Sequence, residues 1–108
     1  MLEPGLDRHD WESRWQSLEE DLEDSPRDVL PELDELVEEM LERRGYEIDD
    51  PVTREGDDRE LVAEFLAARE TTQLLATDPD AVSPGDIGAA VNGYRAVYEH
   101  LLAERGAP

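Results

Sequence analysis

Hydrophobic residues recur every three or four positions along four stretches of the chain, and polar residues fill the positions between them. This spacing predicts amphipathic helices over about residues 8–23, 26–44, 58–76 and 84–104. The links are short apart from residues 45–56, so consecutive helices are expected to run antiparallel. We therefore predict an all-α fold, a small antiparallel four-helix bundle formed by a single acidic helical domain of residues 1–108.

The four hydrophobic stripes differ in width. The first is narrow and carries Trp11, Trp15, Leu18 and Leu22, whereas the fourth is the clearest amphipathic stripe in the chain. The predicted inward positions of the last three helices are Val29, Leu33, Leu36, Val37, Met40 and Leu41; Leu61, Val62, Phe65, Leu66, Ala68, Leu74 and Leu75; and Ile87, Ala90, Val91, Tyr94, Val97, Tyr98, Leu101 and Leu102.

Signals for helix starts precede each stripe. A Ser or Asp is followed three positions later by an acidic residue, which is the arrangement of an N-cap with a carboxylate in the first turn. The predicted pairs are Asp7 with Asp10, Ser25 with Asp28, Asp57 with Glu60 and Ser83 with Asp86.

The second helix carries two further signals. Pro31 removes a backbone hydrogen bond and clashes with the preceding turn, so we expect a kink or a break there, with residues 26–30 as a short separate turn. Gly45 follows Arg43 and Arg44, which predicts a left-handed glycine that ends the helix in a Schellman motif, with Tyr46 packed on Leu41.

Acidic residues dominate the composition. Thirty Asp and Glu stand against 10 basic residues, all of them arginine, and give a formal net charge of −20. Two interpretations stay open: a halophilic-like surface of hydrated carboxylates, or a docking surface for a basic partner. The missing basic footprint argues against direct nucleic-acid binding and against binding to anionic membranes.

The sequence also limits where the protein works. It has no apolar run long enough to span a bilayer, and residues 1–4 do not begin a signal peptide, so we expect a soluble cytoplasmic protein. Because cysteine is absent, disulfides, thiol catalysis and thiolate metal sites are excluded.

Catalytic and metal-binding patterns are weak. The histidines, His9 and His100, lack the Glu-x-x-His order of carboxylate metal bundles, and the acidic stretch from Asp78 fails the spacing of a calcium loop. No serine lies in a nucleophile motif and no glycine-rich phosphate loop occurs. We therefore assign no catalytic, cofactor-binding or metal-binding residue and expect a protein that is not an enzyme and needs no cofactor.

Three features are candidates for interaction. Two tryptophans one helical turn apart either pack against the bundle or anchor a partner. The partly apolar loop is a second candidate, and a stripe of small residues on the fourth helix indicates close contact with another helix of the chain or of a second protomer. The candidate partner-binding residues are Trp11, Trp15, Arg43, Arg44, Tyr46, Ile48 and Val52, and the candidate helix-contact or dimer face is Ala89, Gly93 and Ala96.

These observations favour a non-enzymatic protein that acts through protein–protein interaction or self-association, with an unidentified partner of basic character. An acidic inhibitor that mimics nucleic acid or resembles an antitoxin is the alternative, and a carboxylate metal-binding bundle is a weaker one. A homodimer remains open as well.

Overall fold

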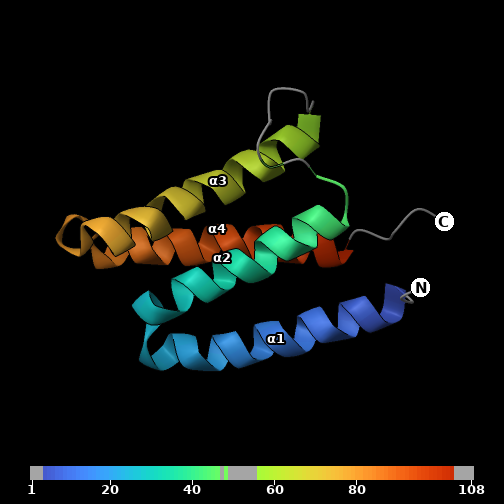
Figure 1. Ribbon diagram of the computed structural model, residues 1–108, viewed down its shortest axis with the longest axis horizontal. Coiled ribbons are helices and arrows are strands. Elements are labelled where there is room, and N and C mark those ends of the chain that lie inside the picture. Colours follow the sequence, from blue (N-terminus) through green and yellow to red (C-terminus); the bar gives the residue numbers. More distant parts are fainter. Residues whose placement is uncertain (1–3, 47, 49–55, 104–108) are drawn as a thin grey trace.

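The computed structural model describes residues 4–46, 48 and 56–103. Within these ranges the chain forms four α-helices and one short 3₁₀ turn, with no strand (Figure 1). The helices are α1 (Pro4–Asp24), α2 (Pro26–Arg43), α3 (Gly56–Thr77) and α4 (Pro84–Ala103), and the turn η2 (Pro79–Ala81) joins α3 to α4. The predicted all-α four-helix bundle is confirmed.

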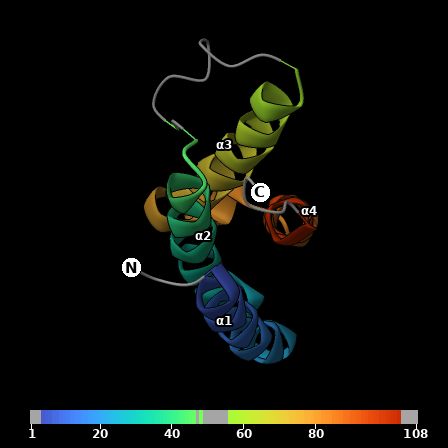
Figure 2. The ribbon, with the colours of Figure 1, turned by 90° about the vertical axis from the view of Figure 1, so that its right-hand side faces the viewer.

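Helix α2 is the centre of the bundle. It packs against α1, α3 and α4, and α3 packs along α4. Figure 2 shows α1 and α3 on opposite sides of α2, with α4 to one side. The molecule measures 46 × 32 × 19 Å, so its shortest dimension is close to the width of two helices at ~10 Å each. The bundle is therefore flat, and the helices are unequally covered.

The inward positions of α2 and α4 follow the predicted stripes. Every predicted position of α2 is buried, and so is Leu30, which the prediction left out. On α3 the prediction is wrong at Leu74, whose surface is 40% exposed, because the buried stripe of the helix continues through Ala68, Thr72 and Leu75 and leaves Leu74 outside it. Leu18, Leu22, Leu66, Leu75, Val91 and Leu102 are only partly buried at the edge of the core.

Of the four predicted caps, the one at α4 forms completely. The Ser83 hydroxyl accepts from the Asp86 amide at 3.1 Å, and the Asp86 carboxylate accepts from the Ser83 amide at 3.0 Å. Ser25 is the N-cap residue of α2, but its side chain makes no capping hydrogen bond. Asp7 and Asp57 are not caps, because α1 begins at Pro4 and α3 at Gly56. Asp7 and Asp57 lie inside the first turns of α1 and α3 instead, where the helix dipole also favours a carboxylate. In so acidic a chain, an Asp near a helix start therefore does not identify the N-cap.

Helix α2 runs through Pro31 without interruption, so the structure has the continuous helix rather than the separate turn. The exposed proline loses one hydrogen bond, while the continuous helix keeps Val29 and Leu30 buried beside Leu33.

The predicted end of α2 is confirmed. Gly45 has φ +86°, its amide donates to Glu42 O at 3.0 Å, and the Tyr46 amide donates to Leu41 O at 2.9 Å. These two hydrogen bonds are the Schellman motif.

Candidate functional site

Both tryptophans of α1 lie inside the bundle. Trp11 is 3% and Trp15 is 5% exposed. Trp15 stacks on Tyr98 of α4 with ring centroids 4.1 Å apart and planes 8° from parallel, and its indole N–H donates to Glu19. The Trp11 indole N–H donates to Glu39 of α2 at 3.4 Å. A partner could touch these rings only by displacing α1, so their role in partner binding stays a prediction.

The candidate residues at the end of α2 are also drawn into the fold. Tyr46 and Ile48 are buried, and Arg44 is half-buried with its guanidinium 5.5 Å from the centre of the Trp11 ring. Arg44 also donates to Leu101 O at 3.4 Å. Arg43 is exposed, and Val52 lies outside the described residues. Arg44 thus joins the end of α2 to the end of α4, and the described geometry does not set these residues apart as a binding face.

The small-residue stripe of α4 is split among three surroundings. A Cβ added to Gly93 would lie 3.3 Å from Ala68 Cβ and 3.7 Å from Glu64 O, so the glycine permits close approach of α3. Ala89 is exposed. Ala96 is half-buried and lines a hollow of about 320 Å³ together with Glu60, Leu61, Glu64 and His100. The helix that Gly93 contacts therefore belongs to the same chain.

A polar network that was not predicted from the sequence joins α2, α3 and α4. Arg69 donates from Nε and Nη2 to both oxygens of Asp34, at 2.6–3.2 Å, and from Nη2 to Glu38 at 2.8 Å. The Tyr94 hydroxyl donates to Asp34 Oδ2 at 2.8 Å. The Thr72 hydroxyl lies 2.6 Å from the Tyr94 oxygen and 3.0 Å from Ala68 O. Because Tyr94 gives its one hydrogen to Asp34, Tyr94 can only accept from Thr72, whose single hydrogen is shared between Tyr94 and Ala68 O.

This network is built for structure. The side chains of Asp34 and Arg69 are 13% and 22% exposed, and the Arg69 guanidinium lies 4.6 Å from the centre of the Phe65 ring. The hydrogen bond to Asp34 raises the pKa of Arg69, and burial raises the pKa of Tyr94, so Arg69 stays charged and Tyr94 neutral near pH 7. Among the described residues, no buried side-chain nitrogen or oxygen of this network lacks a hydrogen-bond partner, and the bonds link α2, α3 and α4 in one register.

Arginines link most of the helix pairs. Arg14 of α1 reaches Glu39 of α2 at 2.7 Å, and Arg69 joins α3 to α2. Arg95 of α4 lies 3.7 Å from Glu19 of α1, and Arg8 of α1 donates to Leu102 O of α4 at 2.9 Å. These arginines thus lie between helices, while Asp and Glu outnumber arginine threefold in the sequence. The outer surface carries the excess negative charge.

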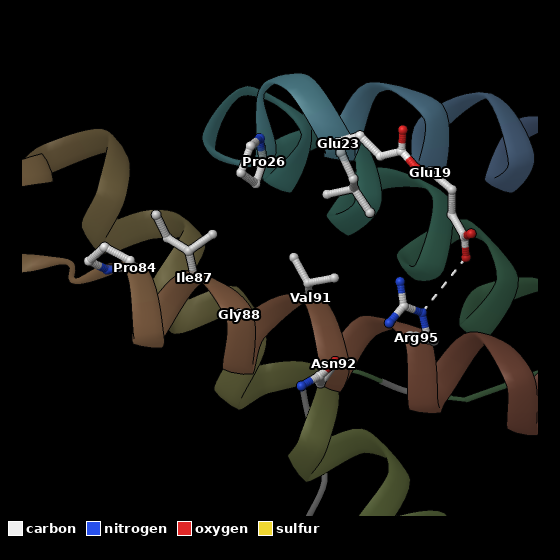
Figure 3. Close-up of a pocket in the computed structure, with 10 residues that line it drawn as sticks. Glu19, Glu23, Pro26, Pro84, Ile87, Gly88, Val91, Asn92 and Arg95 are labelled. Carbon is white, nitrogen blue, oxygen red and sulfur yellow. Dashed lines mark ion pairs between the residues drawn. The ribbon is translucent and has the colours of Figure 1, made fainter.

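An open groove lies between the second half of α1 and the first half of α4 (Figure 3). Its volume is about 410 Å³. Ile87 and Val91 point from α4 toward α1, and the Glu19–Arg95 ion pair marks one end of the groove (Figure 3). We call it the α1–α4 groove; its lining residues are Glu19, Leu22, Glu23, Pro26, Pro84, Ile87, Gly88, Val91, Asn92 and Arg95.

The groove continues around the turn between α1 and α2. A second hollow of about 420 Å³ shares Pro26, Pro84 and Ile87 with it and adds Asp24, Ser25, Arg27 and Asp28. Its floor is apolar and its rim carries charged side chains. The buried polar network contributes no residue to either hollow. The groove could not be recognised from the sequence, because its apolar residues have the same types and spacing as the core positions.

Over the part of the chain described, no three His, Asp or Glu side chains are placed to hold a metal ion together. Each described helix is also too polar or too short to cross a lipid bilayer. Comparison of the chain with protein families, curated proteins and solved structures gives no match.

Proposed function

We propose that this chain is a non-enzymatic binding module that recognises a basic partner protein and anchors it in the α1–α4 groove. The groove is the observation that carries the proposal. Leu22 and Val91 are only partly buried in the groove. The rest of the contact between α1 and α4 is closed by the stacked rings of Trp15 and Tyr98. An apolar floor within a charged rim is the usual anatomy of a protein-binding site.

The charge distribution supports a basic partner. The net charge is −20, and the arginines described above engage carboxylates, carbonyls or rings of this same chain. The resulting negative field raises the rate at which a basic protein associates and opposes acidic competitors. The apolar floor then supplies affinity that does not depend on charge.

A second candidate function is an acidic mimic that occupies a basic site. It is favoured by a row of exposed carboxylates along the outer face of α2, namely Asp28, Glu32, Glu35 and Glu42. Their spacing places them within one face of the helix over a length of about 21 Å. Such a row binds through charge alone.

Salt separates the two functions. The immobilised protein would be exposed to a cell extract at about 0.1 M KCl and washed at about 1 M, where the Debye length falls from ~10 to ~3 Å. Captured proteins would be purified and titrated against the chain by calorimetry. We expect a basic protein that binds with one-to-one stoichiometry and remains bound at the higher salt. A complex that dissociates at the higher salt concentration supports the acidic mimic. If the purified proteins bind at neither salt concentration, both functions are contradicted.

A further inference from the structure

The shape of the α1–α4 groove limits what can lie in it. The part of α4 that lines it runs from Pro84 to Arg95, which is about 16 Å or three helical turns. At one end the Glu19–Arg95 pair and the Trp15–Tyr98 stack close the gap between α1 and α4. At the other end the groove opens around the turn between α1 and α2. A straight element of about three turns fits this trough.

We propose that the occupant of the groove is a basic amphipathic helix of the partner, with apolar side chains seated between Leu22, Ile87 and Val91. This inference rests on the proposed function and names the class of partner segment. Apolar residues at positions i, i+4 and i+7 of the bound helix would face the floor. Arginine or lysine side chains on its flanks would meet the carboxylates of the rim.

The rim explains why the segment is basic. Glu23, Asp24 and Asp28 are exposed around the two hollows. The two arginines there are already engaged, since Arg95 pairs with Glu19 at 3.7 Å and Arg27 donates to Val82 O at 3.3 Å. A second copy of this chain would bring its own large negative charge to a rim of the same sign, which opposes self-association through this face.

The walls explain why the segment is helical. Both walls are α-helices, whose backbone N–H and C=O groups bond within the helix, and the described residues offer no strand edge to extend. An extended peptide would press unpaired backbone groups against the apolar floor, which costs free energy. A helix brings its own backbone hydrogen bonds into the groove.

Gly88 provides a way to fill the groove without disturbing the fold. It lines the floor, and a Cβ added there would meet no atom within 4 Å. The variant Gly88→Leu places a bulky side chain where the partner's apolar residue would lie, and it also removes a helix-interior glycine. Ala89→Leu is the matched control, because Ala89 is exposed on the next position of α4 and does not line the groove.

The probe is a synthetic 14-residue helical peptide with leucine at positions i, i+4 and i+7 and arginine on the flanks, which spans ~21 Å. Fluorescence anisotropy of the labelled peptide gives Kd for the wild-type chain and for both variants, after circular dichroism shows that each is folded. We expect Gly88→Leu to weaken binding about tenfold or more and Ala89→Leu to change it less than about twofold. A peptide with serine in place of leucine should bind about tenfold more weakly than the parent.

Three results would overturn the proposal. Equal binding to the wild-type chain and Gly88→Leu means that the peptide does not lie in the groove. Equal binding of the serine peptide means that charge alone holds it. A doubled mass of the wild-type chain in light scattering, lost in Gly88→Leu, means that the occupant is a second copy. If the purified partner from the capture experiment binds Gly88→Leu at least about tenfold more weakly while the helical peptide does not, the proposed function stands and only the inference of a helical segment fails. If the partner itself binds Gly88→Leu normally, the proposed function fails as well.

Discussion

The interface between α1 and α4 has two halves that differ in the size of the side chains that fill it. In the first half, Trp15 stacks on Tyr98 at 4.1 Å and Arg8 donates to Leu102 O at 2.9 Å. In the second half, Leu22 of α1 and Val91 of α4 both line the α1–α4 groove and stay partly exposed. An aromatic ring buries 150–250 Å² and can span the gap, whereas leucine and valine cannot. Side-chain volume therefore decides where this pair of helices is closed.

The open half cannot close by moving α1 alone. Only Ser25 separates α1 from α2, and its amide donates to Asp21 O at 2.8 Å, so the end of α1 follows the start of α2. The first half of α4 is held on the other side, because Gly93 packs directly against Ala68 of α3. Both walls of the groove are anchored to the rest of the bundle, which keeps the groove open.

The largest expected effect is the loss of a ring from the closed half. Trp15→Ala should lower the free energy of unfolding by about 3–5 kcal/mol, because the stack on Tyr98 is lost and a cavity replaces it. Leu22→Ala, the matched change in the open half, should cost less than about 2 kcal/mol, since its side chain is only partly buried. Urea unfolding followed by circular dichroism measures both.

Comparable losses for Trp15→Ala and Leu22→Ala would contradict the division into a closed and an open half. Light scattering of both variants provides the control, since an increase in mass would mean that the unfolding midpoints also report association.

The next largest effect is a loss of stability at alkaline pH that originates in the closed half. Burial, with smaller contributions from the nearby Glu12 and Glu19, raises the pKa of Tyr98 from 10.0 to about 12. Below pH 10 both the folded and unfolded forms are protonated and the full stability is present. Between pH 10 and 12 the unfolded chain loses its proton first, so stability falls by on the order of 2 kcal/mol.

Urea unfolding across this pH range, with tyrosinate absorbance recorded in parallel, measures the loss. Tyr98→Phe keeps a ring against Trp15 but has no hydroxyl to titrate, so its stability should fall less steeply. Tyr94, whose pKa burial also raises, remains in both proteins and supplies the residual slope. Identical slopes for the wild-type chain and Tyr98→Phe would show that Tyr98 does not titrate late.

The helices and their ends could be predicted from the sequence wherever a local pattern determines them. The spacing of apolar residues identified all four helices, and Gly45 and the Ser83–Asp86 pair marked ends that the structure has. Each of these features depends on residues within about two turns of one another, so the chain carries the whole signal locally.

The buried network and the groove depend on how distant residues meet. Asp34 gave no signal, because thirty acidic residues make any single carboxylate unremarkable. Thr72 did give a signal for the network, because it follows Leu61, Phe65 and Ala68 along the same apolar stripe. A hydroxyl on an apolar stripe indicates a buried hydrogen-bond partner, which here is Tyr94. The groove gave none, because Leu22, Ile87 and Val91 would look the same if another helix covered them.

The smallest expected effect is the difference in stability between alanine substitutions at two glycines of α4, one in the open groove and one packed against α3. Gly88 faces the open groove, and Gly93 faces α3 with Ala68 Cβ 3.3 Å from the position of an added Cβ. Gly88→Ala should raise the free energy of unfolding by about 0.5–1 kcal/mol, because alanine favours the helix and meets no neighbour. Gly93→Ala has the same helix preference but must push α3 outward, so it should be less stable than Gly88→Ala by about 1 kcal/mol.

The urea midpoints of the two variants, measured side by side, test this difference. If the two substitutions stabilise the chain equally, Gly93 does not hold α4 against α3, and the anchoring of that wall of the groove must come from the Tyr94–Asp34 hydrogen bond instead.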